Sequence, residues 1–179
     1  EYEKLMINNI FEFNNKTVAS IMTHRIDIGA LPVEAKLQEV TAFLETERYS
    51  RIPVYEGTID NIVGILYAKD LIYLIRDDAA RDGFNLKSIT RQPYFVPESK
   101  RTDELFRELQ KKNIHIAIVI DEYGGTAGIV TIEDLIEEIV GNIFDEYDEE
   151  DEDFKKIDEN TVVIKGTASL DDVAEFLEV

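Results

Sequence analysis

The chain has 179 residues, with 38 acidic and 19 basic side chains and a formal net charge of −19. A surface this acidic repels polyanions, so neither nucleic acid nor an anionic membrane face is expected as a partner. The chain has no cysteine, which excludes disulfides, thiol catalysis and cysteine metal sites. No apolar stretch approaches the roughly 20 residues that a membrane-spanning helix needs, so we expect this stretch of chain to be soluble.

The first part of the chain predicts a helix, a strand, a helix, two strands and a further helix. An amphipathic helix is predicted over 2–13, where apolar residues share one face. A loosely alternating stretch at 25–31 leads into a helical stripe over 33–46. Strand-like runs at 52–55 and 62–66 then flank a polar turn, and helical spacing resumes at Asp70.

The second part of the chain repeats this pattern, at an offset of 64 residues without a gap over 52–72 and with small slips upstream of it. The pairs that coincide are Ile52 and Ile116, Val54 and Ile118, Gly64 and Gly128, and Asp70 and Asp134. The chain is therefore predicted to be an internal duplication of a β-α-β-β-α unit, in the α/β (α+β) class. A unit of about 60 residues buries little surface alone, so the two should pack about a pseudo-two-fold axis and leave clefts between them.

The sharpest local signal lies at 128–136, where an apolar strand turns into a helix. Thr131 and Asp134 have the spacing of a capping box, in which a hydroxyl and a carboxylate satisfy the first backbone N–H groups of a helix. Such a helix start also favours phosphate, and a nearby carboxylate can accept hydrogen bonds from ribose hydroxyls. The two residues are interpreted either as a plain cap or as part of a nucleotide site.

The last part of the chain differs in composition. Residues 145–153 contain eight carboxylates in nine residues, which is typical of a solvated linker. A hairpin is predicted from 154–157 and 161–164, and Ser169 is predicted to cap a helix over 170–177. These residues are too few for a stable domain, so we expect them to begin a second domain that continues beyond this sequence.

Several motifs in order resemble one protein family. The two strand-to-helix junctions of the form Gly-x-x-x-x-x-Asp resemble those of a tandem pair of cystathionine β-synthase (CBS) domains. The segments at 21–25, 49–55, 115–125 and 128–134 resemble the CorC/HlyC (hemolysin C) transporter family, relatives of the cyclin M magnesium transporters. The boundaries that the resemblance implies are a helical linker at 1–20, CBS repeats at 21–80 and 81–144, an acidic linker at 145–153, and the truncated start of a transporter-associated domain at 154–179.

The resemblance also implies a function. It implies a module on the cytoplasmic face of the cell membrane that controls a membrane domain upstream of Glu1 in a divalent-cation (Mg/Co) transporter. It implies a homodimer and an adenine nucleotide, AMP or ATP, bound between the repeats, with any Mg²⁺ arriving on the ATP phosphates. Carried over by position, Thr131 and Asp134 would hold the ribose and phosphate. The remaining implied site residues are Tyr49, Ser50, Arg51, Ile52 and Pro53 along the adenine, Ile129 and Val130 of the second strand, and Thr23.

The mirror-related cleft departs from the family's pattern. It would be formed by Tyr67, Asp70, Thr90, His115, Ile116 and Ala117. Tyr67 stands where a small hydroxyl is expected, so its ring is predicted to fill the slot and leave one good nucleotide site per chain.

Other interpretations stay open beside the nucleotide sensor. Arg51 either meets phosphate or pairs with a carboxylate, and the module is alternatively a ligand-free dimerisation scaffold. An enzyme is not expected, because no histidine, lysine or cysteine is placed beside Asp134 as base or nucleophile. No metal site is predicted, since the acidic residues lack the fixed order of an EF-hand and are interpreted as a solvated face: Glu137, Glu138, Asp145, Glu146 and Asp148.

Overall fold

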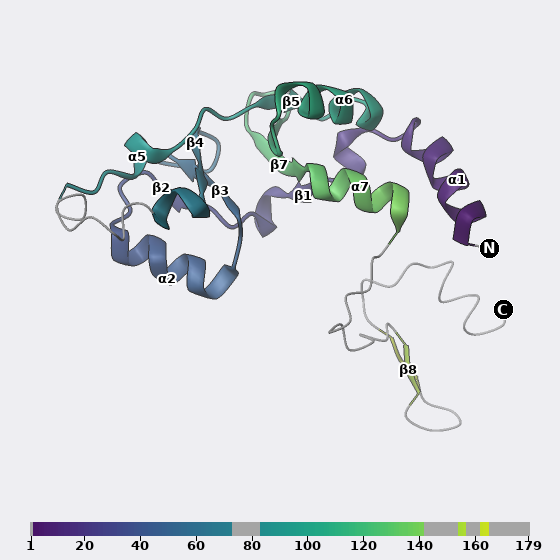
Figure 1. The fold of residues 1–179 in the computed structure, drawn as a ribbon, viewed down its shortest axis with the longest axis horizontal. Coiled ribbons are helices and arrows are strands. Elements are labelled where there is room, and N and C mark those ends of the chain that lie inside the picture. The colour runs from purple at the N-terminus through teal and green to yellow at the C-terminus, as the bar shows by residue number, and fades with distance from the viewer. Residues whose placement is uncertain (1, 73–82, 142–153, 157–161, 165–179) are drawn as a thin grey trace. The chain divides into compact units, whose positions relative to one another are not determined.

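A computed structural model describes residues 2–72, 83–141, 154–156 and 162–164 (Figure 1). The chain divides into two compact units, residues 1–141 and 142–179, and each is described by itself. The acidic run, the helix predicted at 170–177 and most of the helix predicted from Asp70 lie outside the described residues. No helix in the described part of the chain is both long and apolar enough to cross a membrane.

The second unit contains the predicted hairpin. Strand β8 (Phe154–Lys156) pairs antiparallel with β9 (Val162–Ile164), and Lys155 lies opposite Val163. The short turn between them falls outside the described residues.

The first repeat is a three-stranded sheet covered by a helix. Strand β2 (Leu31–Pro32) runs parallel to β3 (Arg51–Tyr55), and β3 runs antiparallel to β4 (Ile62–Tyr67). Helix α2 (Leu37–Glu47) begins later than the sequence predicts, because Lys36 is its N-cap and donates its backbone N–H to Glu39 at 2.7 Å. A 3₁₀ turn, η3 (Ala68–Asp70), follows β4.

The prediction of a strand at 25–31 is wrong. Only Thr23–His24 (β1) and Leu31–Pro32 are extended, and a 3₁₀ turn, η2 (Arg25–Asp27), separates them. The chain bends here because it passes from the sheet of one repeat to the sheet of the other, which a single straight strand cannot do.

The second repeat has the same order of elements. They are a short helix α5 (Leu86–Ile89), strand β5 (Phe95–Pro97), helix α6 (Thr102–Lys112), strands β6 (Ile116–Ile120) and β7 (Thr126–Thr131), and helix α7 (Ile132–Val140). Helix α1 (Tyr2–Phe13), which matches the predicted bounds, packs on α7, where Asn9 Nδ2 donates to the carbonyl oxygen of Ile139 at 3.4 Å. A 3₁₀ turn, η1 (Val18–Ser20), connects α1 to β1, and Val18 is fully buried in the hydrophobic core of the second repeat.

Each sheet is completed by a segment from the start of the other repeat. Strand β1 belongs to the start of the first repeat but pairs with β7 of the second, with Thr23 opposite Ile129. In the mirror arrangement, Arg91 lies near the start of the second repeat and bridges to Ile65 of β4 through backbone hydrogen bonds of 2.8 and 2.9 Å. A shared apolar cluster, built on Ile62 and Ile65 with Ile116 and Ile118, joins the two sheets. The predicted face-to-face packing of two repeats is confirmed.

The ungapped offset of 64 residues is wrong for β3 and β6. Strands β4 and β7 do align at 64, since Gly64 pairs with Val54 and Gly128 pairs with Val119. By the same pairings, however, Val54 is the counterpart of Val119 rather than of Ile118, so β3 and β6 align at 65. The cause is the hairpin turn, which runs over 56–61 in the first repeat and over the one residue shorter 121–125 in the second.

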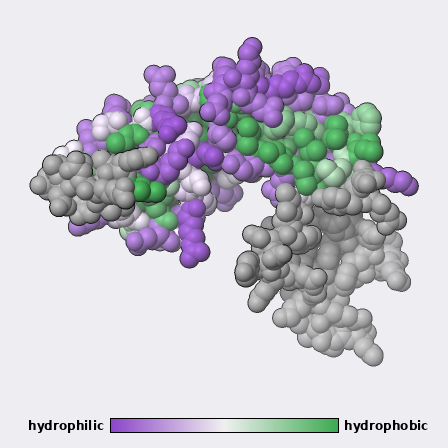
Figure 2. All heavy atoms as spheres, viewed as in Figure 1, coloured by the Kyte–Doolittle hydropathy of each residue, from purple (hydrophilic) through white to green (hydrophobic). Residues whose placement is uncertain are grey.

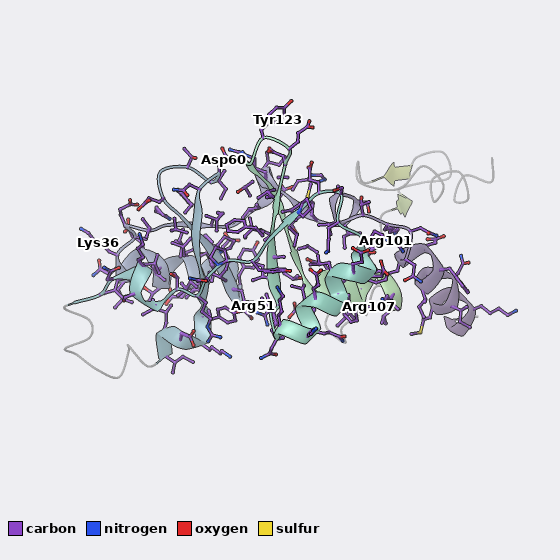
Figure 3. All side chains as sticks on the ribbon, turned by 90° about the horizontal axis from the view of Figure 1, so that it is seen from above. Lys36, Arg51, Asp60, Arg101, Arg107 and Tyr123 are labelled. Carbon is purple, nitrogen blue, oxygen red and sulfur yellow. The ribbon has the colours of Figure 1, made fainter. Side chains whose placement is uncertain are left out.

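The two hairpins are tied together at one edge of the unit. Asp60 accepts a hydrogen bond from the Thr126 backbone N–H at 3.0 Å and forms an ion pair with Arg25. Figure 3 shows Asp60 and Tyr123 at this same edge. The Arg25 guanidinium and the Thr126 N–H together hold the pKa of the Asp60 carboxyl below its usual range. These contacts fix the start of η2, which carries the following residues toward the cleft between the repeats.

Candidate functional site

A cavity of about 370 Å³ lies between the start of β3 and the junction of β7 with α7. Its walls therefore come from both repeats. The sequence-predicted residues that line it are Thr23, Tyr49, Ser50, Arg51, Ile129, Thr131 and Asp134. The other predicted residues, Ile52, Pro53 and Val130, are buried within the strands and do not line the cavity. In β7 burial alternates, so Val130 faces the core while Ile129 and Thr131 face the cleft. In β3 the adjacent residues Ile52 and Pro53 are both buried, so both faces of that strand are covered.

The capping box at the start of α7 is formed. The Thr131 hydroxyl oxygen accepts from the Asp134 N–H at 3.2 Å, and Asp134 Oδ2 accepts from the Thr131 N–H at 2.7 Å. A hydroxyl that accepts one bond still carries a proton to donate, and a carboxylate that uses one oxygen keeps a second as acceptor. The cap therefore fixes both side chains and leaves one donor and one acceptor for a ligand.

An aromatic wall stands opposite this helix start. The Tyr49 ring is 44% exposed and packs at a tilt on Phe43, with 6.4 Å between ring centroids. Gly29 lies directly behind it, because a Cβ at this position would come within 2.6 Å of the Tyr49 ring. Tyr49 is thus held from behind while one part of its ring is open to the cavity. Such a ring is a stacking surface for a planar aromatic ligand.

Arg51 occupies the boundary between the repeats. Its Nη1 donates to Glu133 Oε1 at 2.9 Å, which links β3 to α7, and its side chain is only 19% exposed. Figure 3 shows Arg51 in the middle of the first unit, where the two repeats meet. The predicted pairing with a carboxylate is therefore present, and the same side chain also lines the cavity.

Several lining residues were not anticipated from the sequence. They are Asp27, Gly29, Arg48 and Glu133. Ile116, which was predicted for the mirror-related cleft, lines this cavity instead. Arg48 ends α2 in the left-handed conformation, with φ of 55°, which places it beside Tyr49 at the cavity mouth. The lining as a whole holds three carboxylates, Asp27, Glu133 and Asp134, against the two guanidinium groups. No group of three or more acidic or histidine side chains in the described residues is arranged to hold a metal ion.

The mirror-related cleft also contains a cavity. A cavity of about 300 Å³ lies beside Tyr67, lined by Arg51, Lys69, Arg91, Asn113 and His115 among others. The prediction that the Tyr67 ring fills this slot is wrong, because the ring lies along the wall with the Arg91 guanidinium 4.0 Å from its centroid. Asp70, which was also predicted for this cleft, does not line the cavity, and both of its carboxylate oxygens accept hydrogen bonds from Arg91.

Comparisons with known proteins agree with this architecture. A family model described as "CBS domain" matches residues 18–77 and 86–141. Hemolysin C from Brachyspira hyodysenteriae is 44% identical over 176 residues, which cover 98% of this chain and 64% of that protein. The magnesium and cobalt efflux protein CorC from Escherichia coli (strain K12) is 40% identical over 171 residues, which cover 95% of this chain and 58% of that protein. This chain therefore spans less than two thirds of the length of either relative.

A solved structure described as the CBS domain of the bacterial CNNM/CorC family Mg²⁺ transporter in complex with ATP is also similar. It is 46% identical, has a TM-score of 0.76, and the match covers 80% of this chain and 100% of that one. The duplicated fold, the crossed edge segments and these matches together show that the chain belongs to the CBS domain family, as a tandem CBS pair of the CorC/hemolysin C type.

Proposed function

We propose that this chain is the regulatory module of a divalent-cation (Mg/Co) transporter and binds an adenine nucleotide in the cavity between its repeats. The observation that carries the proposal is the composition of that cavity, in which an anchored aromatic ring faces a capped helix start. Tyr49 and Ile116 offer an apolar slot for the adenine, and Thr131 and Asp134 offer a donor and an acceptor for the ribose and phosphate. A similar CBS domain has been solved in complex with ATP, which supports the same ligand class here.

The charges of the cavity favour particular forms of the nucleotide. Three carboxylates and two guanidinium groups line it, so a bare triphosphate would bring its negative charge close to Glu133 and Asp134. A monophosphate brings less charge, and Mg²⁺ on the phosphates of ATP neutralises part of the rest. We therefore propose AMP or Mg²⁺-bound ATP as ligand, with Arg48 and Arg51 on its phosphate side.

Regulation follows from the two-sided construction of the cavity. A ligand that contacts Tyr49 of one repeat and Thr131 of the other favours one spacing of the repeats, by as much as its affinity differs between the two spacings. We propose that this change reaches a membrane domain of the same full-length protein, with this module at the cytoplasmic face.

We further propose that the module acts as a homodimer. Hydrophobic residues gather over α7 and α1 in Figure 2. Among them, Ile7, Phe11 and Ile136 are 56%, 66% and 39% exposed. An apolar surface on neighbouring helices is typical of a protein–protein interface.

Isothermal titration with AMP, ADP and ATP, each with and without Mg²⁺, tests the ligand. We expect one nucleotide per chain, and we expect a variant with both Thr131→Ala and Asp134→Ala to bind none while staying folded and dimeric. Thr131→Ser is the matched control, because serine keeps the hydroxyl and the cap and should keep the binding. Absence of heat and of thermal stabilisation with every nucleotide would contradict the proposal.

The same titration separates the sensor from a ligand-free scaffold. In a ligand-free scaffold, Thr131 and Asp134 would serve only to cap α7, and the capping box shows that they can do so without a ligand. A binding function is favoured over catalysis because the described residues that line the cavity include no histidine, lysine or cysteine to serve as base or nucleophile. The absorbance of the purified protein near 260 nm is a second test, since a retained nucleotide would add a shoulder there.

A further inference from the structure

The cavity beside Tyr67 differs in charge from the nucleotide cavity. Its lining contains Arg51, Lys69 and Arg91 and no carboxylate. All three cations surround one ring, with 4.0 Å from Arg91, 5.8 Å from Lys69 and 5.9 Å from Arg51 to the Tyr67 centroid. In a chain with twice as many acidic as basic residues, these three side chains are a local concentration of positive charge beside a cavity.

The nearby carboxylates offset this charge only in part. Asp70 holds Arg91 in a bidentate pair, and Glu133 holds one nitrogen of Arg51, but both lie outside the cavity lining. Lys69 forms no ion pair with a described carboxylate and is exposed. Among the described residues, the carboxylates therefore compensate only part of the positive charge along this cavity wall.

Two buried polar atoms at this cavity have no hydrogen-bond partner among the described residues. They are Arg51 Nε and His115 Nδ1, and both residues line the cavity. A buried donor or acceptor without a partner destabilises the folded state, because it has given up its hydrogen bonds to water. A bound oxyanion with its coordinated water offers several oxygens to such a cluster, and guanidinium groups are well suited to phosphate oxygens.

The residue at the pseudo-symmetric position of Thr131 distinguishes the two cavities. Tyr67 precedes η3 without a side-chain cap hydrogen bond, so this cavity lacks the threonine hydroxyl and the formed helix cap that the other cavity offers to a nucleoside. We propose that this cavity is a binding site for a small phosphate-type oxyanion, such as inorganic phosphate or pyrophosphate, and not for a nucleotide. The overall charge of −19 does not prevent this, because at physiological salt charges more than about 8 Å away are largely screened.

Calorimetric titration of the full chain with inorganic pyrophosphate, in a chloride buffer without Mg²⁺, tests the proposal. We expect saturable binding that Lys69→Gln weakens at least about threefold and Arg91→Gln at least about tenfold. Arg107→Gln is the matched control, since it removes the same charge from an exposed arginine of α6 and should leave the affinity unchanged. Lys69→Gln remains informative if Arg91→Gln fails to fold, because Lys69 is exposed and lies outside the core.

A second arm assigns the binding to this cavity rather than to the nucleotide cavity. The variant with both Thr131→Ala and Asp134→Ala should keep its affinity for pyrophosphate. Loss of pyrophosphate binding in that variant, an unchanged affinity in Lys69→Gln and Arg91→Gln, or no binding by the wild type would each overturn the proposal. The two proposals are tested with different variants: Lys69→Gln and Arg91→Gln for pyrophosphate, and Thr131→Ala with Asp134→Ala for the nucleotide. Failure of one proposal therefore does not decide the other.

Discussion

Replacement of Gly128 by alanine tests the crossed arrangement of the repeats. A Cβ at Gly128 would lie 2.4 Å from the Thr23 carbonyl oxygen and 2.7 Å from Met22 Sδ. The first of these contacts is with backbone, which cannot move aside as a flexible side chain can. Overpacking of this kind costs about 1–3 kcal/mol, so at about 2 kcal/mol the melting temperature of a chain of this size falls by about 4–8 °C.

The same substitution should reach the nucleotide cavity. Gly128 pairs with His24 in the sheet, and the neighbouring Thr23 lines the cavity. Displacement of β1 moves Thr23, so we expect Gly128→Ala to weaken nucleotide binding as well as stability. At the mirror position, a Cβ on Gly64 would come within 2.4 Å of the Thr90 hydroxyl oxygen. Gly64→Ala should therefore destabilise the chain with a smaller effect on the nucleotide.

The assay is thermal unfolding followed by circular dichroism, with nucleotide titration of each variant at a temperature where it is folded. Gly83→Ala is the matched control, because a Cβ there would meet nothing within 4 Å. The reasoning would be refuted if Gly128→Ala melted with the wild type, or if Gly83→Ala lost as much stability as Gly128→Ala.

Three further predictions concern single contacts. Tyr49→Ala removes the aromatic wall and should weaken adenine nucleotide binding about tenfold in calorimetry, while Tyr49→Phe keeps it. Glu133→Gln removes the charge partner of Arg51, so ATP without Mg²⁺ should bind more tightly than to the wild type. The Lys100 ammonium, with the Tyr94 hydroxyl, holds the pKa of Glu108 below its usual range. Glu108→Gln should therefore lose about 0.5–1 kcal/mol at pH 7 in urea unfolding.

The sign of the pH dependence follows from the direction of that shift. A carboxyl whose pKa is lowered by folding stabilises the folded state above its unfolded pKa of about 4.3, and this contribution disappears as the pH falls through the lower folded value. The stability difference between wild type and Glu108→Gln should thus be constant near neutral pH and shrink progressively as the pH falls below about 4.3. A difference that does not shrink in acid would contradict the ion pair between Lys100 and Glu108. Unchanged nucleotide binding by Tyr49→Ala or by Glu133→Gln would contradict the roles given to those two residues.

Local signals in the sequence were sufficient for much of the fold. The apolar spacing of α1 and α6 and the capping box of α7 depend on residues within one or two turns of a helix, so the sequence alone locates them. The one-residue error in the offset between β3 and β6 has a physical cause. Every residue of β6 is apolar and the strand is buried on both faces, so a slip by one residue leaves the pattern unchanged.

The candidate site was predictable only where its residues belong to a local motif. Thr131 and Asp134 are fixed by their own spacing, and Tyr49 and Arg51 were identified through the family resemblance. Asp27 and Gly29 come to the cavity because β1 crosses to the other repeat, which no local pattern shows. Arg48 depends on a left-handed helix end that is uncommon for a residue other than glycine.

A crystal structure of the chain grown with ATP and Mg²⁺ tests the central claim most directly. The account predicts one nucleotide per chain, with its adenine against Tyr49 and its ribose hydroxyls within hydrogen-bond distance of Asp134. A nucleotide bound at any other surface, or a cavity between Tyr49 and Thr131 that stays free of nucleotide at saturating concentration, would contradict it.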